Sequence, residues 1–214
     1  MSKRAPYSIL YEDDRIIAVY KSRDVFTVQT DDKKTWRHNL FYYLSLRAKE
    51  RREQVFLVHR LDYETSGILL FAKTKEALVE LKKIFETRRV KRLYEAVVLE
   101  RLEPGLQEEI HLLLDVKENG KVIIGPKGKE SITRFETANQ IQIGTALKIE
   151  ILTGRKNQIR LSLHKAGLTL IGDKRYSDSD AKRMYLNAYQ ISLPSESSFT
   201  KKDYFVTPLW LSMK

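Results

Sequence analysis

Residues 55–72 read VFLVHRLDYETSGILLFA, and this stretch decides how we expect the fold to be organised. A short apolar run, Val55 to Val58, leads directly into a polar segment. Ile68 to Ala72 is then continuously apolar, which is typical of a strand whose two faces are both buried. Thr65, Ser66 and Gly67 favour a turn between the two apolar runs. The stretch therefore predicts a strand, a polar turn and a buried strand.

Outward from this stretch, strands and helices follow one another without regular alternation. Before it, we expect strands at Tyr7–Tyr11 and Arg15–Lys21, and a helix from Thr35 to about Lys49. After it, Thr74 is expected to cap a helix that places Leu78, Leu81 and Phe85 on one face. The later elements that the sequence predicts are strands at Leu93–Leu99, Ala146–Leu152, Leu168–Ile171, Met184–Leu193 and Tyr204–Leu211, and a helix at Arg155–Ala166. This mixture indicates an α+β fold with a mostly antiparallel sheet.

The charge of the chain indicates a polyanionic partner. Lysine and arginine number 39 and aspartate and glutamate 28, so the formal net charge is 39 − 28 = +11 over 214 residues. A basic surface kept for solubility is the alternative explanation, and binding to a membrane surface is a weaker one. No run approaches the about 18 apolar residues that a membrane span needs. The length suits one domain, or one domain with two lobes.

The absence of cysteine narrows the possible chemistry. With no cysteine in the chain, disulfides, zinc–cysteine sites and a thiol nucleophile are excluded. Met1 to Tyr7 carries charge with no long apolar run after it, so we expect no secretory signal. Together these features favour the cytoplasm.

Three residues have side chains that could form one catalytic site. The Asp62 carboxylate, at the end of a predicted strand, could act as a nucleophile or a base. The Arg160 guanidinium could hold such a carboxylate ionised, and Tyr94 could stack on a base or handle a proton. Taken singly, each also fits an ordinary role: a turn aspartate, a core tyrosine, and an arginine on a solvated helix face beside His164.

Two other chemistries find less support in the sequence. His59, Asp62 and Glu64 could suggest a metal site, but they fall within one short turn and no second ligand cluster accompanies them. The glycines of 125–129 lack the spacing of a phosphate-binding loop.

Five segments, in order along the chain, resemble the RluA family of pseudouridine synthases. Residues 59–73 are similar to the family signature HRLD-x-x-T-S-G followed by an apolar strand, and residues 91–98 resemble its K-x-Y-x-A-x-V strand. Residues 154–161 are similar to its G-R-T-H-Q-I-R-V motif. Residues 168–176 and 185–188 resemble its H-P-I-x-G-D-x-x-Y and L-x-L-H-A segments. Five motifs in family order make the resemblance specific.

The resemblance implies an activity and a role for each site residue. The family isomerises uridine to pseudouridine in RNA without a cofactor or metal. Asp62 matches the catalytic aspartate, which attacks the ribose or the base or assists elimination through a glycal. Tyr94 matches the tyrosine that stacks on the target base, and Arg160 the basic residue that pairs with the aspartate. Arg60 matches the arginine that replaces the flipped nucleotide in the RNA stack. The residues that we expect to contact RNA are Arg60, His59, Arg155, Arg88, Arg89, Lys91 and Arg92.

The sequence departs from the family pattern at four places. Lys156-Asn157 replaces Thr-His, Asn187 replaces a histidine, 21–24 replaces Lys-Pro-x-Gly, and Leu168-Thr169 replaces His-Pro. None of these positions is assigned to chemistry, so we expect them to affect substrate detail and local packing. The pattern begins near Ile9, which implies a short form without the N-terminal RNA-binding module of many relatives.

The sequence thus predicts an RNA pseudouridine synthase that acts on ribosomal or transfer RNA. We expect a single catalytic domain over residues 1–214, monomeric, with a central, mostly antiparallel mixed sheet, flanking helices and a catalytic cleft. Asp62 should lie within hydrogen-bond reach of Arg160, with the Tyr94 ring nearby. Two alternatives remain: a non-catalytic RNA-binding protein on the same scaffold, and a basic hydrolase that uses Asp62 and His59.

Overall fold

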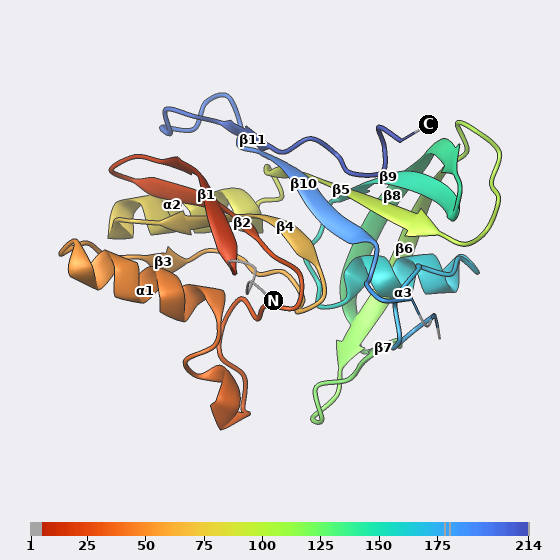
Figure 1. Cartoon of the computed structure of the whole chain (residues 1–214), viewed down its shortest axis with the longest axis horizontal. Coiled ribbons are helices and arrows are strands. Elements are labelled where there is room, and N and C mark those ends of the chain that lie inside the picture. Colours follow the sequence, from red (N-terminus) through yellow and green to blue (C-terminus); the bar gives the residue numbers. More distant parts are fainter. Residues whose placement is uncertain (1–5, 178, 180, 214) are drawn as a thin grey trace. The chain divides into compact units, whose positions relative to one another are not determined.

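The computed structural model describes residues 6–177, 179 and 181–213, in which eleven strands and three α-helices alternate irregularly (Figure 1). This confirms the α+β class. The chain divides into two compact units, Met1–Val90 with Gln190–Val206 and Lys91–Tyr189 with Thr207–Lys214. The single domain over residues 1–214 stays a prediction. The expectation about a secretory signal rests partly on residues 1–5, which lie outside the described residues.

The first unit is built around a small antiparallel sheet. Its strand order is β1-β2-β4, with β3 pairing β4 and β11 pairing the end of β10. Its elements are β1 (Tyr7–Glu12), β2 (Ile16–Lys21), the 3-10 turn η1 (Lys33–Thr35), α1 (Leu40–Glu50), β3 (Phe56–Leu57), β4 (Ser66–Ala72), α2 (Lys75–Glu86), the last residues of β10 (Leu186–Ser192) and β11 (Asp203–Phe205).

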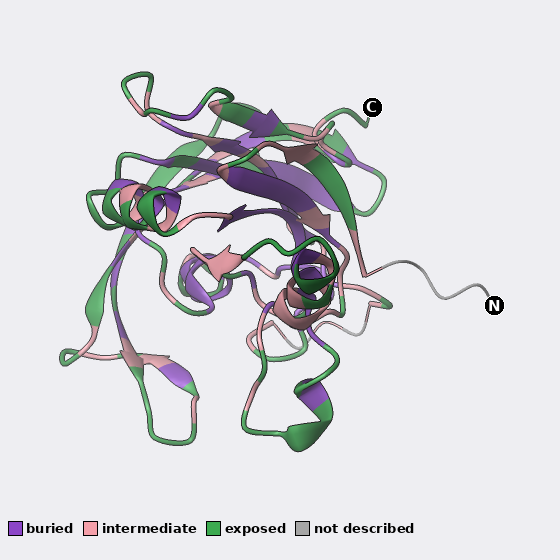
Figure 2. Cartoon of the chain, turned by 90° about the vertical axis from the view of Figure 1, so that its left-hand side faces the viewer, coloured by how far each residue is buried: buried purple, intermediate pink, exposed green. Residues whose placement is uncertain are grey.

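Strand β4 is buried along its whole length, as predicted for Ile68–Ala72, but it begins two residues earlier, at Ser66 within the expected turn. Ile68 and Leu70 belong to the core that β4 shares with Leu81 of α2. On the opposite face of the strand, the ring of Phe71 stacks on Phe41 of α1 with centroids 6.4 Å apart. Because a helix covers each face, both sets of alternating side chains are apolar. In Figure 2 the central strands are accordingly purple, whereas the outer turns of the helices are green.

The two helices of this unit begin where a side chain caps them. Thr74 accepts a hydrogen bond from the Ala77 amide at 3.1 Å, which confirms it as the cap of α2. The expected start of α1 at Thr35 is wrong. Asn39 accepts from the Tyr42 amide at 2.9 Å and so begins the helix at Leu40. The preceding 33–35 forms a separate 3-10 turn.

Glu12 ties three elements of the first unit together. Its carboxylate accepts two hydrogen bonds from Arg47 of α1, at 2.9 and 2.6 Å, and one from Lys73, just after β4, at 3.0 Å. The hydrogen bonds from Arg47 outweigh the effect of burial and lower the pKa of Glu12 to about 2. The ionised form is therefore the one that the folded state stabilises.

The second unit is a five-stranded antiparallel sheet with one helix. Its strand order is β5-β9-β8-β6-β7, and α3 packs against β6 and β8 (Figure 1). The predicted alternation in 146–152 is confirmed, since Leu147 and Ile149 are fully buried. The elements are β5 (Lys91–Val98), β6 (Gln107–Val116), β7 (Val122–Ile124), β8 (Lys129–Ile141), β9 (Gly144–Ile151), α3 (Gln158–Lys165) and the first residues of β10.

Two strands that the sequence predicts near the C-terminus are wrong in extent. Within 168–171 only Leu170 pairs, in an isolated bridge to Val98. Of 204–211 only the beginning is a strand, because β11 ends at Phe205. The reason is Glu95, which has no exposed surface and accepts from the amides of Trp210 at 2.7 Å and Leu211 at 3.3 Å. Those amides meet a buried carboxylate instead of a neighbouring strand.

No helix among the residues that the structure describes is long and apolar enough to cross a membrane.

We predict that Glu12→Gln lowers the free energy of unfolding by about 1 to 2 kcal/mol at neutral pH. The carboxyl pKa is 4.5 without these partners and about 2 in the folded protein. The stabilisation is therefore complete above pH 4.5 and disappears as the pH falls toward 2. Urea unfolding from pH 2 to 7 measures this. The exposed Glu86→Gln is the matched control, and a Glu12→Gln protein that parallels wild type at every pH would contradict the assignment.

Candidate active site

The Asp62 segment is a loop of the first unit, between β3 and β4. Asp62 is half-buried, and its carbonyl accepts a hydrogen bond from the Thr65 amide at 3.2 Å, which closes the predicted turn. The residue before it, Leu61, is held from both sides by Thr27. The Thr27 hydroxyl donates to the Leu61 carbonyl at 2.8 Å and accepts from the Leu61 amide at 3.2 Å. Because Thr27 is 3% exposed, the backbone at Asp62 is fixed from the interior.

Lys21, a residue that the sequence analysis did not assign to the site, supports the same loop. Its ammonium has no exposed surface and donates to the carbonyls of Ser22, Val25 and Tyr63 at 3.1, 2.8 and 3.2 Å. Burial lowers the pKa of Lys21 to about 7, and the charge of Asp62 opposes that shift. Three carbonyl acceptors match the three protons of an ammonium. Through these bonds Lys21 joins the loop to the end of β2.

His59 and Arg60, both expected to contact RNA, differ in their surroundings. His59 is half-buried, stacks on Phe85 with centroids 4.6 Å apart, and accepts from the Leu70 amide at Nε2 over 3.1 Å. That nitrogen is occupied within the protein, which weighs against the hydrolase alternative. Arg60 is exposed. The contact of each residue with RNA stays a prediction.

Tyr94 and Arg160 belong to the second unit. Tyr94 lies on β5 opposite Ile149 and is 7% exposed. Arg160 lies on α3 and is 3% exposed, so the alternative of a solvated helix face beside His164 is wrong. His164, one turn later, is exposed. An arginine is seldom this deeply buried unless a partner neutralises it.

Arg160 forms a buried ion pair with Asp173. Arg160 donates from Nε at 2.8 Å and from Nη2 at 2.6 Å to the two carboxylate oxygens. Asp173 has no exposed surface and also accepts from the amides of Arg175 at 2.9 Å and Tyr176 at 3.2 Å. Burial alone would raise the pKa of Asp173, but the hydrogen bonds and charge of Arg160 lower it below its usual range. The pair sets the plane of the guanidinium.

The loop before α3 is fixed by a buried amide. Gln158 accepts from the Thr153 hydroxyl at 2.8 Å and the Arg155 amide at 3.0 Å, and donates to Ile132 and Thr133 of β8. The loop contains one departure from the family pattern. Asn157 has φ +56°, a left-handed conformation that asparagine tolerates.

Asn157 also has a partner that orients the next segment. Its side-chain amide donates to the Tyr176 hydroxyl at 2.8 Å, and the Arg160 guanidinium lies over the Tyr176 ring at 5.3 Å. Helix α3 begins at Gln158, three residues later than the sequence predicts.

Arg92 is the predicted RNA contact that lies deepest in the protein. It is 7% exposed and donates to the Thr153 carbonyl at 3.1 Å. The Arg92 guanidinium also explains why residue 154 is a glycine, since a Cβ at that position would lie 2.7 Å from Nη1 of Arg92.

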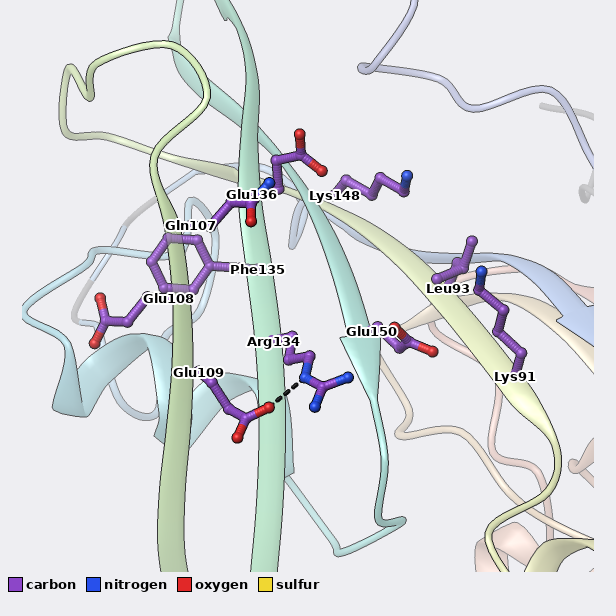
Figure 3. A pocket seen from close by; sticks show the side chains of 10 residues that line it. All are labelled: Lys91, Leu93, Gln107, Glu108, Glu109, Arg134, Phe135, Glu136, Lys148 and Glu150. Atoms are coloured by element: carbon purple, nitrogen blue, oxygen red, sulfur yellow. Dashed lines mark hydrogen bonds and ion pairs between the residues drawn. The ribbon is translucent and has the colours of Figure 1, made fainter.

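The other predicted RNA contacts lie nearer the surface. Arg88 and Lys91 are exposed, Arg89 pairs with Glu196, and Arg155 donates to the Glu130 carbonyl at 2.9 Å. Lys91 lines a pocket of about 370 Å3 on the sheet of the second unit. Figure 3 shows this pocket, in which glutamates alternate with cations and Arg134 bonds Glu109. The RNA contacts of all these residues stay predictions.

The structure thus supplies two residues that the sequence analysis missed, Lys21 and Asp173. Each residue has a sequence feature that could have pointed to it. Lys21 ends an apolar strand, and Asp173 belongs to a segment similar to a family motif. Asp62 lies in the first unit and Tyr94 and Arg160 in the second, and the pairing of Asp62 with Arg160 stays a prediction. Among residues 6–177, 179 and 181–213, no three histidine, aspartate or glutamate side chains are grouped to hold a metal ion.

Residues 15–165 match the family model described as RNA pseudouridylate synthase. A ribosomal large subunit pseudouridine synthase D of Vibrio cholerae is 32% identical over 175 residues, 80% of this chain and 53% of that protein. A dual-specificity RNA pseudouridine synthase RluA of Haemophilus influenzae is 31% identical over 198 residues, 88% and 87% of the two chains. This chain spans about half the length of several curated relatives that it matches.

The solved structures agree on the fold. The human RNA pseudouridylate synthase domain containing 1 has a TM-score of 0.73 at 24% identity, covering 94% of this chain and 82% of that one. The human RNA pseudouridylate synthase domain containing 4 has the same TM-score at 19% identity, covering 87% and 84%. The predicted fold family is therefore confirmed.

We predict that Asp173→Asn lowers the free energy of unfolding by about 3 to 5 kcal/mol, because it removes the buried negative charge that accepts two hydrogen bonds from Arg160. Urea unfolding at neutral pH measures the change. Asp115→Asn, which removes a surface ion pair with Lys117, is the control and should cost less than about 1 kcal/mol. An Asp173→Asn protein as stable as this control would contradict the role of the pair.

Proposed function

This chain belongs to the RNA pseudouridylate synthase family, and from that premise we propose that it isomerises uridine to pseudouridine in RNA. The observation that carries the proposal is the Asp62 loop, in which Thr27 and Lys21 fix the backbone on both sides of a half-buried carboxylate. A carboxylate that must meet a reacting atom benefits from such a fixed backbone.

We assign to Asp62 the catalytic role. The reaction breaks the bond from the ribose to the uracil nitrogen and forms a bond from the ribose to a uracil carbon. The carbon loses one proton and the released nitrogen gains one, so no other reactant is consumed and no cofactor is required. Asp62 attacks the ribose or the base, or assists elimination through a glycal, and an ionised carboxylate serves each of these routes.

Tyr94 and Arg160 complete the proposed site. Tyr94 is to stack on the target base, and its hydroxyl is a candidate acceptor for the proton that leaves carbon. Arg160 is to pair with Asp62 and keep it ionised. The contact with Asp173 orients the guanidinium through Nε and Nη2 of Arg160.

The net charge of +11 supports RNA as the substrate, because lysine and arginine side chains neutralise phosphates. Arg60, which is exposed on the Asp62 loop, is proposed to take the place of the extruded uridine in the RNA stack. Unstacking costs a few kcal/mol, so a loop or irregular helix of ribosomal or transfer RNA is the preferred target. We propose that the protein acts as a monomer in the cytoplasm.

Asp62→Asn tests the catalytic assignment. We expect pseudouridine formation to fall on the order of 1000-fold or more, with RNA affinity within about threefold of wild type. Pseudouridines are mapped by chemical labelling of total RNA from cells that lack the gene and carry either variant. Asp14→Asn, at an exposed turn of the same unit, is the control. An active Asp62→Asn enzyme would refute the role of Asp62.

Tyr94→Phe separates stacking from proton transfer. The phenyl ring still stacks, so RNA affinity should be retained, whereas loss of the hydroxyl should lower the rate at saturating RNA on the order of 100-fold. Tyr94→Ala should lower both the RNA affinity and the rate at saturating RNA. Single-turnover kinetics and filter binding measure them. A Tyr94→Phe enzyme with the wild-type rate would leave Tyr94 with stacking alone.

A further inference from the structure

A second aromatic site lies in the first unit, apart from the residues assigned to catalysis. Trp36 is 50% exposed, although tryptophan is a residue that folded proteins usually cover. Its ring lines a pocket of about 370 Å3, within the range of small-ligand sites. Other residues that line the pocket are Gln29, Asn39, Phe41, Tyr42 and Ser45.

The backbone that carries Trp36 is held firmly. Asn39 donates from its side-chain amide to the carbonyls of Thr35 at 2.8 Å and Trp36 at 3.2 Å. The Thr35 hydroxyl, in turn, donates to the Asp32 carbonyl at 2.8 Å and accepts from the Thr30 amide at 2.8 Å. An exposed ring on such a fixed backbone is preorganised, so little conformational entropy is lost when a ligand covers it.

The polar groups around the ring are suited to a ligand with hydrogen-bonding edges. The Trp36 and Gln29 side chains are both exposed, so the indole N–H and the side-chain amide are accessible to a ligand. An amide carries both a donor and an acceptor, which is the pattern that a nucleobase edge presents in return.

The charge near Trp36 favours an anionic ligand. Lys33, Lys34 and Arg37 are exposed and lie within three residues of Trp36 in sequence. Two aspartates precede them, and one of these, Asp32, accepts from the Lys34 amide as the cap of η1. Figure 1 and Figure 2 both show this segment, just before α1, extending away from the strands of its unit. Cations interleaved with an exposed aromatic ring are typical of single-stranded RNA binding.

The pocket is connected to the Asp62 loop through one residue. Thr27 bonds both backbone groups of Leu61 through its hydroxyl, and its own carbonyl accepts from the amide of the pocket residue Phe41 at 3.0 Å. The pocket and the Asp62 loop are therefore anchored to the same buried residue of the first unit.

We propose that Trp36 and this pocket bind an unpaired base of the substrate RNA, a nucleotide other than the target uridine. The base stacks on the indole, its edge meets Gln29, and the flanking cations bind the adjacent phosphates. This rests on the proposed function for the identity of the substrate, but binding of an unpaired base is measured without any isomerisation.

The test compares single-stranded with paired RNA. We expect Trp36→Ala to weaken binding of a fluorescein-labelled 12-nucleotide oligo(U) by about 5- to 100-fold, the usual effect of losing one stacked base. Binding of a 12-base-pair RNA duplex should change less than about twofold. Trp36→Phe should keep most of the affinity. Phe205→Ala, which removes an aromatic ring that is 70% exposed in the same unit, is the matched control.

Tryptophan fluorescence supplies a direct signal. The chain has two tryptophans, and the second, Trp210, is 5% exposed. Oligo(U) should quench the wild-type emission, and Trp36→Phe should abolish that quenching while circular dichroism and the urea midpoint stay unchanged. The duplex should not quench.

Each contrary result identifies which proposal fails. Unchanged oligo(U) affinity in Trp36→Ala, or an equal loss for duplex, overturns the base site. So does a concentration-dependent dimer that Trp36→Ala dissolves with RNA affinity intact, because the occupant is then a second copy of this chain. Trp36-dependent binding without any pseudouridine in wild-type cells overturns the proposed function and leaves the base site standing. A wild-type protein that binds neither oligo(U) nor the duplex overturns both the base site and the proposed function.

Discussion

Three charged side chains without exposed surface, Lys21, Glu95 and Asp173, hold the irregular segments of this protein in place. A buried charge is costly unless hydrogen bonds satisfy it, and here backbone groups of loops supply many of those bonds. Lys21 binds the carbonyl of Tyr63 in the Asp62 loop and that of Val25 after β2, and Glu95 binds the amides of the C-terminal turn. The buried charges therefore fix the loops, and the backbone groups of the loops satisfy the hydrogen bonds that the charges require.

Asp173 applies the same constraint to a proposed functional group. Its carboxylate is shared between the Arg160 guanidinium and two backbone amides. The guanidinium is thus oriented by the chain segment that follows α3. Because the pair is bidentate, Arg160 is fixed in direction as well as in position, and lysine would not substitute for it. A residue assigned to catalysis here depends on a carboxylate that takes no part in the reaction.

The first unit carries both the Asp62 loop, proposed for catalysis, and Trp36, proposed to bind an unpaired base. Thr27 links the Asp62 loop to the start of α1, and Trp36 lies on the segment between Thr27 and α1. Proteins that modify a base must extrude it, and the cost of unstacking is offset by contacts to the strand around it. An aromatic site beside the catalytic loop would supply such a contact.

Apolar periodicity and motif order were sufficient to determine the α+β class, most strands, the cap at Thr74, and the family. These are local properties, since a buried strand must be apolar and a cap must offer a side-chain oxygen. The short β11 and the burial of Arg92 and Arg160 were decided by tertiary structure alone. Each depends on a partner distant in sequence, such as Glu95 for the residues near Trp210. A single sequence shows which side chains carry charge, but only the folded chain determines which of those charges lose contact with water and must find partners within the protein.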